Sequence, residues 1–355
     1  MSRNICYINL ASNVPARDVP YITGLCARGV AVNEFCVSAP GFCKYVKLWH
    51  ILRDRRNEWD LVWIGFSGHL LPPLVRLAIR APVVFNAAHS LYEGIVVSRG
   101  RRNLRNFWGA VPWFIDFIGF RCVDRILVET NSQIRYCSRL FALPEQKFIR
   151  AWHGTNEKVF HPDPDVKKLS HFTVLFRGAF LPESGIMVLA EAARLLKQGD
   201  VRFRIIGNGV LAPRLERFLV EYPLPNVEWI GERLSDNDLR TKMLECHLSL
   251  GQLADHPRLL RTIPHKAYES IAMGLPYLTA RNPGILELLH EGETCLCFTP
   301  GDADDLARTI LASRNDRITL DAVAHRASEF FRGQLTAERL TKHLIEELRS
   351  LGIAS

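Results

Sequence analysis

The stretch of residues best suited to chemistry is TIPHKAYESIAMGLPYLTA, residues 262–280, which reads as a loop, an amphipathic helix and a buried strand. Pro264 fits the first turn of a helix, and Gly274 is typical of a helix end. Lys266 and Glu269 are three residues apart, so they lie on one face near the helix start. We expect a phosphate on Lys266 and the helix N-terminus, and a sugar hydroxyl on Glu269.

Short apolar runs alternate with helical patterns through the first half of the chain, which is typical of a parallel α/β sheet. Expected strands there are 5–10, 30–37, 60–65, 82–86 and 125–130. Ligands bind at the carboxyl ends of such strands. The loop 86–93 follows one of them and contains His89 and Glu93, for which we predict a catalytic or sugar-positioning role. A structural role for His89 is the alternative.

The pattern restarts after Pro162 and Pro164, which mark a linker. We therefore predict an N-terminal Rossmann-like domain over 1–160, a C-terminal one over 161–335, and a final helical segment over 336–355. Packing of that segment against the N-terminal domain is one option. Two domains also agree with a length of 355 residues and a hydrophobic fraction of 48%.

A glycine-rich turn, GNGVLA, follows an expected strand and contains Gly207 and Gly209. With Glu228 further on, it satisfies the pattern of a dinucleotide-binding turn. A dehydrogenase usually places this turn on the first strand of its cofactor domain, whereas here it comes later, and Pro213 interrupts the helix start. We interpret the glycines as a tight turn beside a nucleotide, and a nicotinamide enzyme remains a weaker alternative.

Positive charge is concentrated in the first half of the chain. Residues 1–160 contain 21 Lys and Arg against 11 Asp and Glu, whereas the remainder contains 24 against 26. This favours an anionic partner, and we predict acceptor binding by Arg17, Arg101 and Arg102. Arginines and aromatic residues over 98–120 suit peripheral contact with a membrane, although core packing of the aromatics is an equal alternative. Without an RNA-binding or helix-turn-helix signature, we expect no nucleic acid.

Nine scattered cysteines without a CxxC pair support neither a disulfide framework nor a zinc site, so we expect free thiols and no metal. The N-terminus lacks the pattern of a signal peptide, and the longest near-apolar run, 107–120, is too short to span a bilayer. We expect a cytoplasmic protein, with the inner face of the membrane as an alternative location.

Several segments resemble the retaining glycosyltransferases of the group 1 family, also called glycosyltransferase family 4, in that family's order. The likeness covers most of the chain and is strongest from Arg125 onward. It is carried by these segments: FNAAHSLYEGIV, HGTNE with VFHPDP, FRGAFLPESGIMVLAEAARLL, RIIGNG, NVEWIGERLSDNDLRTKM, IPHKAYESIAMGLPYLTA and ELLHEGETCLCFTPGDADDLARTI.

The resemblance implies the α/β GT-B fold, with two Rossmann-like parallel-sheet domains facing across a cleft. It also implies that the C-terminal domain binds a nucleoside-diphosphate sugar and the N-terminal domain binds an acceptor. The sugar nucleotide is a substrate, so no cofactor is expected. The predicted donor-binding residues are Glu269, Lys266, Arg177, Gly178, Arg261, Gly207, Gly209, Trp229 and Ile230.

The chain departs from the family pattern at its charged positions. Glu269 matches the second of the family's two glutamates, whereas the first falls on Arg261. The basic pair that neutralises the donor diphosphate falls on Ala179 and Ser184. We expect Lys266 and Arg177, with Arg261 as a further candidate, to replace that pair.

The resemblance implies transfer with retention of anomeric configuration, without a metal ion, to a glycan or lipid-linked acceptor, as in polysaccharide biosynthesis. In such transfer the departing diphosphate helps to deprotonate the acceptor. The lost glutamate and basic pair keep a second hypothesis open, a non-catalytic GT-B protein that binds a nucleotide or glycan. A sugar-nucleotide epimerase is a further alternative.

Overall fold

The computed structural model describes residues 4–98 and 107–349, and it divides into two compact units. The first contains residues 1–97, 101–155 and 334–355, and the second contains 98–100 and 156–333. The main boundary thus follows Thr155, five residues before the expected position. Each unit is described by itself below.

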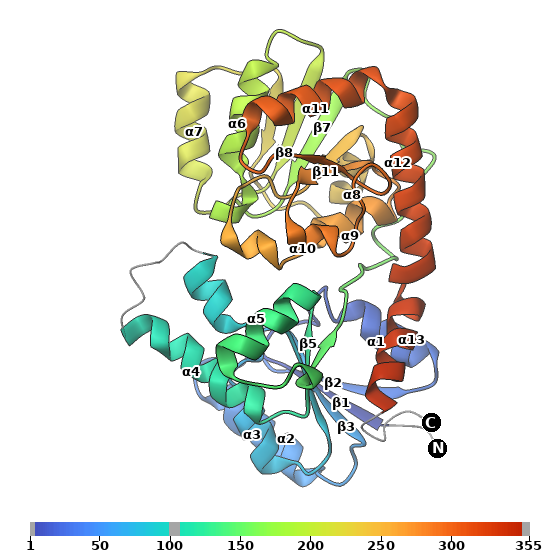
Figure 1. The fold of residues 1–355 in the computed structure, drawn as a ribbon. Helices are drawn as coiled ribbons and strands as arrows, with labels where there is room; N and C mark the ends of the chain where they lie inside the picture. The colour runs from blue at the N-terminus through green and yellow to red at the C-terminus, as the bar shows by residue number, and fades with distance from the viewer. Residues whose placement is uncertain (1–3, 99–106, 350–355) are drawn as a thin grey trace. The chain divides into compact units, whose positions relative to one another are not determined.

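The described part of the first unit contains a sheet of six parallel strands in the order β2-β1-β3-β4-β5-β6 (Figure 1). Their bounds are β1 Asn4–Asn9, β2 Ala31–Cys36, β3 Leu61–Ile64, β4 Val83–Ala88, β5 Arg125–Val128 and β6 Phe148–Arg150. Every residue of β3 and β4 is buried, as expected for strands covered on both faces. In the register, Ile5 of β1 is paired with Val32 on one side and Leu61 on the other.

Two helices of the first unit begin where a threonine side chain satisfies a free backbone N–H group. Thr130 accepts a hydrogen bond from the backbone N–H of Gln133, and Thr336 accepts one from that of Arg339. The helices are α1 Val19–Ala27, α2 Cys43–Asp54, α3 Pro72–Ala78, the π-helix η1 Glu93–Val97, α4 Phe107–Arg121, α5 Asn131–Phe141, the 3-10 turn η3 Glu145–Lys147 and α13 Ala337–Leu348. Within this unit α13 packs on α1, where a Cβ on Gly24 would lie 2.1 Å from Thr341 Oγ1.

The described part of the second unit also contains six parallel strands, in the order β12-β11-β10-β7-β8-β9 (Figure 1). Their bounds are β7 Phe172–Arg177, β8 Val201–Ile206, β9 Val227–Ile230, β10 Leu248–Leu250, β11 Tyr277–Ala280 and β12 Leu296–Phe298. A core that includes Val174, Leu189, Phe203 and Leu306 joins the sheet to its helices. The prediction of two parallel α/β halves is confirmed.

The helices of the second unit are η4 Pro182–Ser184, α6 Ile186–Leu195, α7 Ala212–Glu221, α8 Asp236–Leu244, η5 Pro257–Leu260, α9 His265–Ala272, α10 Pro283–Leu286, α11 Ala303–Asn315 and α12 Arg317–Phe330. The π-helix η6, Phe331–Leu335, contains the point at which the chain returns to the first unit. Pro264 is extended and precedes α9, so this helix begins one residue later than predicted, and Gly274, with φ +71°, follows its end. Over the described residues, each helix is too short or too polar to cross a membrane.

Candidate donor and acceptor sites

Glycines line the carboxyl edge of the second sheet. The adjacent strands β10, β7, β8 and β9 are followed directly by Gly251, Gly178, Gly207 and Gly231. A Cβ on Gly207 would lie 2.0 Å from the carbonyl oxygen of Gly178, and its φ is +145°. Only glycine permits this approach between the loops. The backbone along this edge is therefore free of side chains at four neighbouring positions.

Lys266 projects from α9 into the interior and not toward solvent. Its Nζ donates a hydrogen bond to the carbonyl oxygen of Gly251 at 2.9 Å and lies 3.9 Å from the centroid of the Phe176 ring. Burial, and secondly the positive charge of Arg177, lower the pKa of Lys266 well below its usual value. An anion bound at this edge would stabilise the charged ammonium group of Lys266 and so raise its pKa again.

Glu269 is 4% exposed, so it is not an ordinary solvent-facing helix residue. Its carboxylate forms an ion pair with Arg177, the last residue of β7, and lies 3.0 Å from His265 Nδ1. Burial lowers the pKa of Arg177 to about 10. The structure thus brings Arg177, Lys266 and Glu269 together beside the glycine loops.

The other predicted donor residues hold this edge in different ways. Trp229 Nε1 donates a hydrogen bond to the carbonyl oxygen of Gly207 at 3.0 Å, and Ile230 is the last residue of β9. Gly209 lies in the same turn as Gly207, and half-buried Arg261 follows η5. Outside this set, Glu228 is paired with Arg204 at 2.6 Å. That pair gives Glu228 a structural partner, which weakens the nicotinamide alternative.

A buried acid in the loop between β7 and α6 was missed by sequence reasoning. Glu183 is 4% exposed, accepts a hydrogen bond from Ser98 Oγ at 2.5 Å and lies 3.9 Å from Arg258 Nη1. It directly precedes Ser184, where the family resemblance implies a basic residue. Arg258 therefore places a cation near this loop from a different segment of the chain.

A buried carboxylate organises the carboxyl edge of the first sheet. Asp18 accepts hydrogen bonds from Tyr7 Oη at 2.8 Å, Asn86 Nδ2 at 2.6 Å and the backbone N–H of Phe66 at 3.0 Å. Burial raises the pKa of the Asp18 carboxyl, and these three hydrogen bonds oppose that rise. Asp18 was also missed in the sequence, where its one signal was the polar Asn86 at the end of the apolar run PVVF.

Two of the predicted first-unit residues share a contact with one ring. The guanidinium of Arg17 lies 4.3 Å from the centroid of the Phe66 ring, and the His89 ring meets the same ring edge-on at 5.8 Å. His89 Nδ1 also lies 3.0 Å from the carbonyl oxygen of Ser90. Arg17 and His89 are thus held near each other at the carboxyl edge of the first sheet.

Glu93 has a different environment from His89. Its side chain is fully buried and accepts a hydrogen bond from Gln133 Nε2 at 2.7 Å. Through these contacts Glu93 anchors α5. A direct contact with substrate would require the Glu93 side chain to become accessible. The predicted acceptor residues Arg101 and Arg102 lie outside the described residues.

Residues 171–316 match the model of the family Glycosyl transferases group 1. This range contains every strand of the second sheet and the cluster of Arg177, Lys266 and Glu269. The match agrees with the resemblance to group 1 glycosyltransferases seen in the sequence, over this part of the chain.

Curated relatives include an uncharacterized glycosyltransferase of Methanocaldococcus jannaschii, 25% identical over 52% of this chain and 49% of the relative. A putative colanic acid biosynthesis glycosyltransferase, WcaL of Escherichia coli, is 24% identical over 59% of this chain and 52% of the relative. The chain therefore spans about half the length of the curated relatives it matches.

Solved structures resemble nearly the whole chain. HepE of Anabaena, solved with UDP and glucose, has a TM-score of 0.74 at 17% identity, covering 98% of this chain and 100% of that one. Sucrose-phosphate synthase of Thermosynechococcus elongatus has a TM-score of 0.79 at 16% identity, covering 99% and 100%. The two parallel sheets and these likenesses establish the predicted GT-B fold.

Proposed function

We propose that the protein is a retaining glycosyltransferase that moves a sugar from a nucleoside-diphosphate sugar to a glycan or lipid-linked acceptor. The observation that carries this proposal is the cluster of Arg177, Lys266 and Glu269 at the carboxyl edge of a sheet within the group 1 region. Structures of HepE with UDP and with UDP-glucose add support, because that protein has the same fold.

In this proposal Lys266 and Arg177 neutralise the donor diphosphate, since they are a buried and a half-buried cation beside backbone that a phosphate can approach. Glu269 orients Arg177 and accepts a hydrogen bond from a hydroxyl of the donor. The acceptor attacks on the face from which the diphosphate departs, and the diphosphate takes up the acceptor proton. The protein then supplies positioning and charge stabilisation, and neither a metal ion nor another cofactor is needed.

We assign the acceptor to the first unit, with Arg17 and His89 as its contacts. The positive excess of residues 1–160 favours an anionic or lipid-linked glycan and peripheral contact with a membrane from the cytoplasm. Assembly of a cell-surface polysaccharide is the role we propose, because one curated relative carries a putative role in colanic acid biosynthesis.

A thermal-shift panel of UDP-, GDP-, ADP- and dTDP-sugars tests donor binding, since a ligand of the folded state raises its melting temperature. The donor found in this way then enters a transfer assay with glycan acceptors. Proton NMR of the product should show the anomeric configuration of the donor, and a chelator should leave the rate unchanged. An inverted product would overturn the retaining mechanism.

The second candidate is a GT-B protein that binds a sugar nucleotide without transferring it. It is favoured by Arg261 in place of the first family glutamate and by the ion pair through which Glu269 already engages Arg177. A melting shift with one donor, but neither transfer nor hydrolysis across the acceptor panel, would support this candidate against the enzyme.

A further inference from the structure

Two cysteine side chains lie in contact at one edge of the second sheet. Cys295 directly precedes β12, and Cys297 is the middle residue of this strand, which is the outermost in the sheet order. Residues two apart on a strand point to the same face. The two sulfur atoms are 3.8 Å apart, and both thiols are free. The strand thus brings together two groups that can react with each other.

The two thiols differ in their access to solvent. Cys295 is fully buried, whereas Cys297 is half-buried and can be reached by a small reagent. A hydrogen bond with Cys297, and secondly burial, raise the pKa of the Cys295 thiol. Because the thiolate is the nucleophile in cysteine chemistry, the reachable Cys297 reacts first with a reagent, and Cys295 lies where it can attack the product.

The backbone holds both cysteines in place. The N–H of Cys295 donates a hydrogen bond to the carbonyl oxygen of His290 at 3.2 Å, and its own carbonyl oxygen accepts one from the N–H of Gly292 at 2.8 Å. Cys297 is paired in register with Thr279 of β11. The contact between the two sulfur atoms therefore follows from the backbone of the turn and the strand.

The spacing of the two cysteines permits a disulfide but strains it. Residues two apart on a parallel strand span about 6.6 Å between their Cα atoms, near the upper end of the range for disulfides, roughly 4.4–6.8 Å. The sulfur atoms would have to approach from 3.8 Å to about 2.0 Å. An outermost strand can adjust in this way without displacing a second neighbour. Because strained disulfides are more easily reduced, a bridge here would be reversible.

We propose that Cys295 and Cys297 form a reversible redox site that low-molecular-weight disulfides oxidise. The Cys297 thiolate attacks one sulfur of such a disulfide, which forms a mixed disulfide and releases one thiolate. Cys295 then loses its proton and attacks the Cys297 sulfur, which closes the internal disulfide and releases the second thiolate. Two cysteine thiols are oxidised, and the reagent is reduced to two thiols that take up the two protons. The proposal does not rest on glycosyl transfer, because the donor residues take no part in it.

Peptide mass spectrometry of the full-length protein tests this site after incubation with oxidised glutathione. Remaining thiols are alkylated under denaturing conditions, and trypsin then releases residues 282–308, in which Cys295 and Cys297 are the only cysteines. We expect this peptide to lose the mass of two hydrogen atoms and to carry neither glutathione nor an alkyl group. Treatment of the oxidised protein with dithiothreitol should restore two thiols that can be alkylated.

Cys43 is the matched control, because it is an exposed cysteine of the same chain and should keep glutathione as a mixed disulfide. Cys295→Ala should trap glutathione on Cys297, since the second thiol is then absent. Glutathione that stays on Cys297 in the unchanged protein would overturn the internal disulfide. Two free thiols in residues 282–308, at a glutathione concentration that modifies Cys43, would overturn the site itself. Both of these outcomes are measured without a variant.

Discussion

The carboxyl edges of the two sheets contain buried charges of opposite sign. In the first unit the charge is the Asp18 carboxylate, and neutral donors from Tyr7, Asn86 and Phe66 surround it. In the second unit the charges are the cations of Arg177 and Lys266, with Glu269 beside them. Both arrangements offset the cost of burying charge. They differ in that the first is a closed hydrogen-bonded network, whereas the second is the site at which we propose that an anion binds.

Asp18→Ala should produce the largest effect and should act on stability. It leaves two buried donors and one partly buried donor without this acceptor, and each buried group costs about 1–3 kcal/mol. We expect a loss of about 3–5 kcal/mol in the free energy of unfolding, allowing for partial relaxation. Urea denaturation followed by circular dichroism measures it.

Asp54→Ala is the matched control for this substitution, because Asp54 is an exposed acid at the end of α2 in the same unit. Its stability should stay within about 0.5 kcal/mol of the unchanged protein. A loss of less than about 1 kcal/mol in Asp18→Ala would show that the network is not a structural centre.

Lys266→Met should have the opposite profile, a loss of binding without a comparable loss of stability. Methionine fills a similar volume and removes a buried charge, which is often neutral for folding. The Kd for the donor found in the thermal-shift panel should rise about 30-fold, or about 2 kcal/mol. Calorimetry measures the Kd, and Lys197→Ala, an exposed lysine of the same unit, is the control. Unchanged donor affinity would remove Lys266 from the site.

Donor binding should also depend on pH through Lys266. In the free protein its pKa is well below the ordinary value because of burial and Arg177. A bound diphosphate raises that pKa, so the complex takes up a proton between the two pKa values, and affinity falls as pH rises through this window. Calorimetry in buffers of different ionisation enthalpy measures how many protons are taken up on binding. Uptake that persists in Lys266→Met would assign the proton to another group.

Local patterns predicted the sheets and the helix of residues 265–272, because apolar periodicity and glycine stops depend on neighbouring residues. The contacts of that helix were not predictable in the same way. Lys266 reaches Gly251 and Glu269 pairs with Arg177, and the second contact joins segments about 90 residues apart. The sequence predicted that Lys266 and Glu269 contact one ligand side by side. In the structure Lys266 contacts the residue after β10, whereas Glu269 contacts the last residue of β7.

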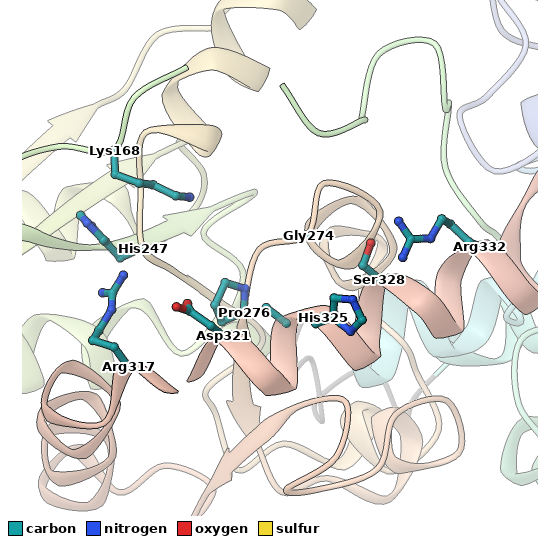
Figure 2. A pocket seen from close by; sticks show the side chains of 10 residues that line it. Lys168, His247, Gly274, Pro276, Arg317, Asp321, His325, Ser328 and Arg332 are labelled. Atoms are coloured by element: carbon teal, nitrogen blue, oxygen red, sulfur yellow. The ribbon is translucent and has the colours of Figure 1, made fainter. Parts of the chain in front are cut away.

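Residues that work through distant partners were missed for the same reason. Asp18 is a single acid before a helix, and only folding brings Asn86 and Phe66 to it. A pocket at the amino ends of β10 and β11 likewise combines Lys168 and Arg317, which come from separate segments (Figure 2). A charged residue with no local pattern gives no signal until the sheet order is known.

Arg17→Ala should give the smallest effect and tests the assignment of the first unit to the acceptor. Its guanidinium stacks on Phe66, a contact worth about 0.5–1 kcal/mol at an accessible site, so stability should change little. If Arg17 contacts an anionic acceptor, the acceptor KM should rise about three- to fivefold while the donor KM stays constant, the effect of one exposed charge pair. Arg28→Ala, at the end of α1 in the same unit, is the control. A change in the donor KM instead would mean that the first unit does not bind the acceptor separately from the donor. The contrast between the two carboxyl edges would then concern stability alone.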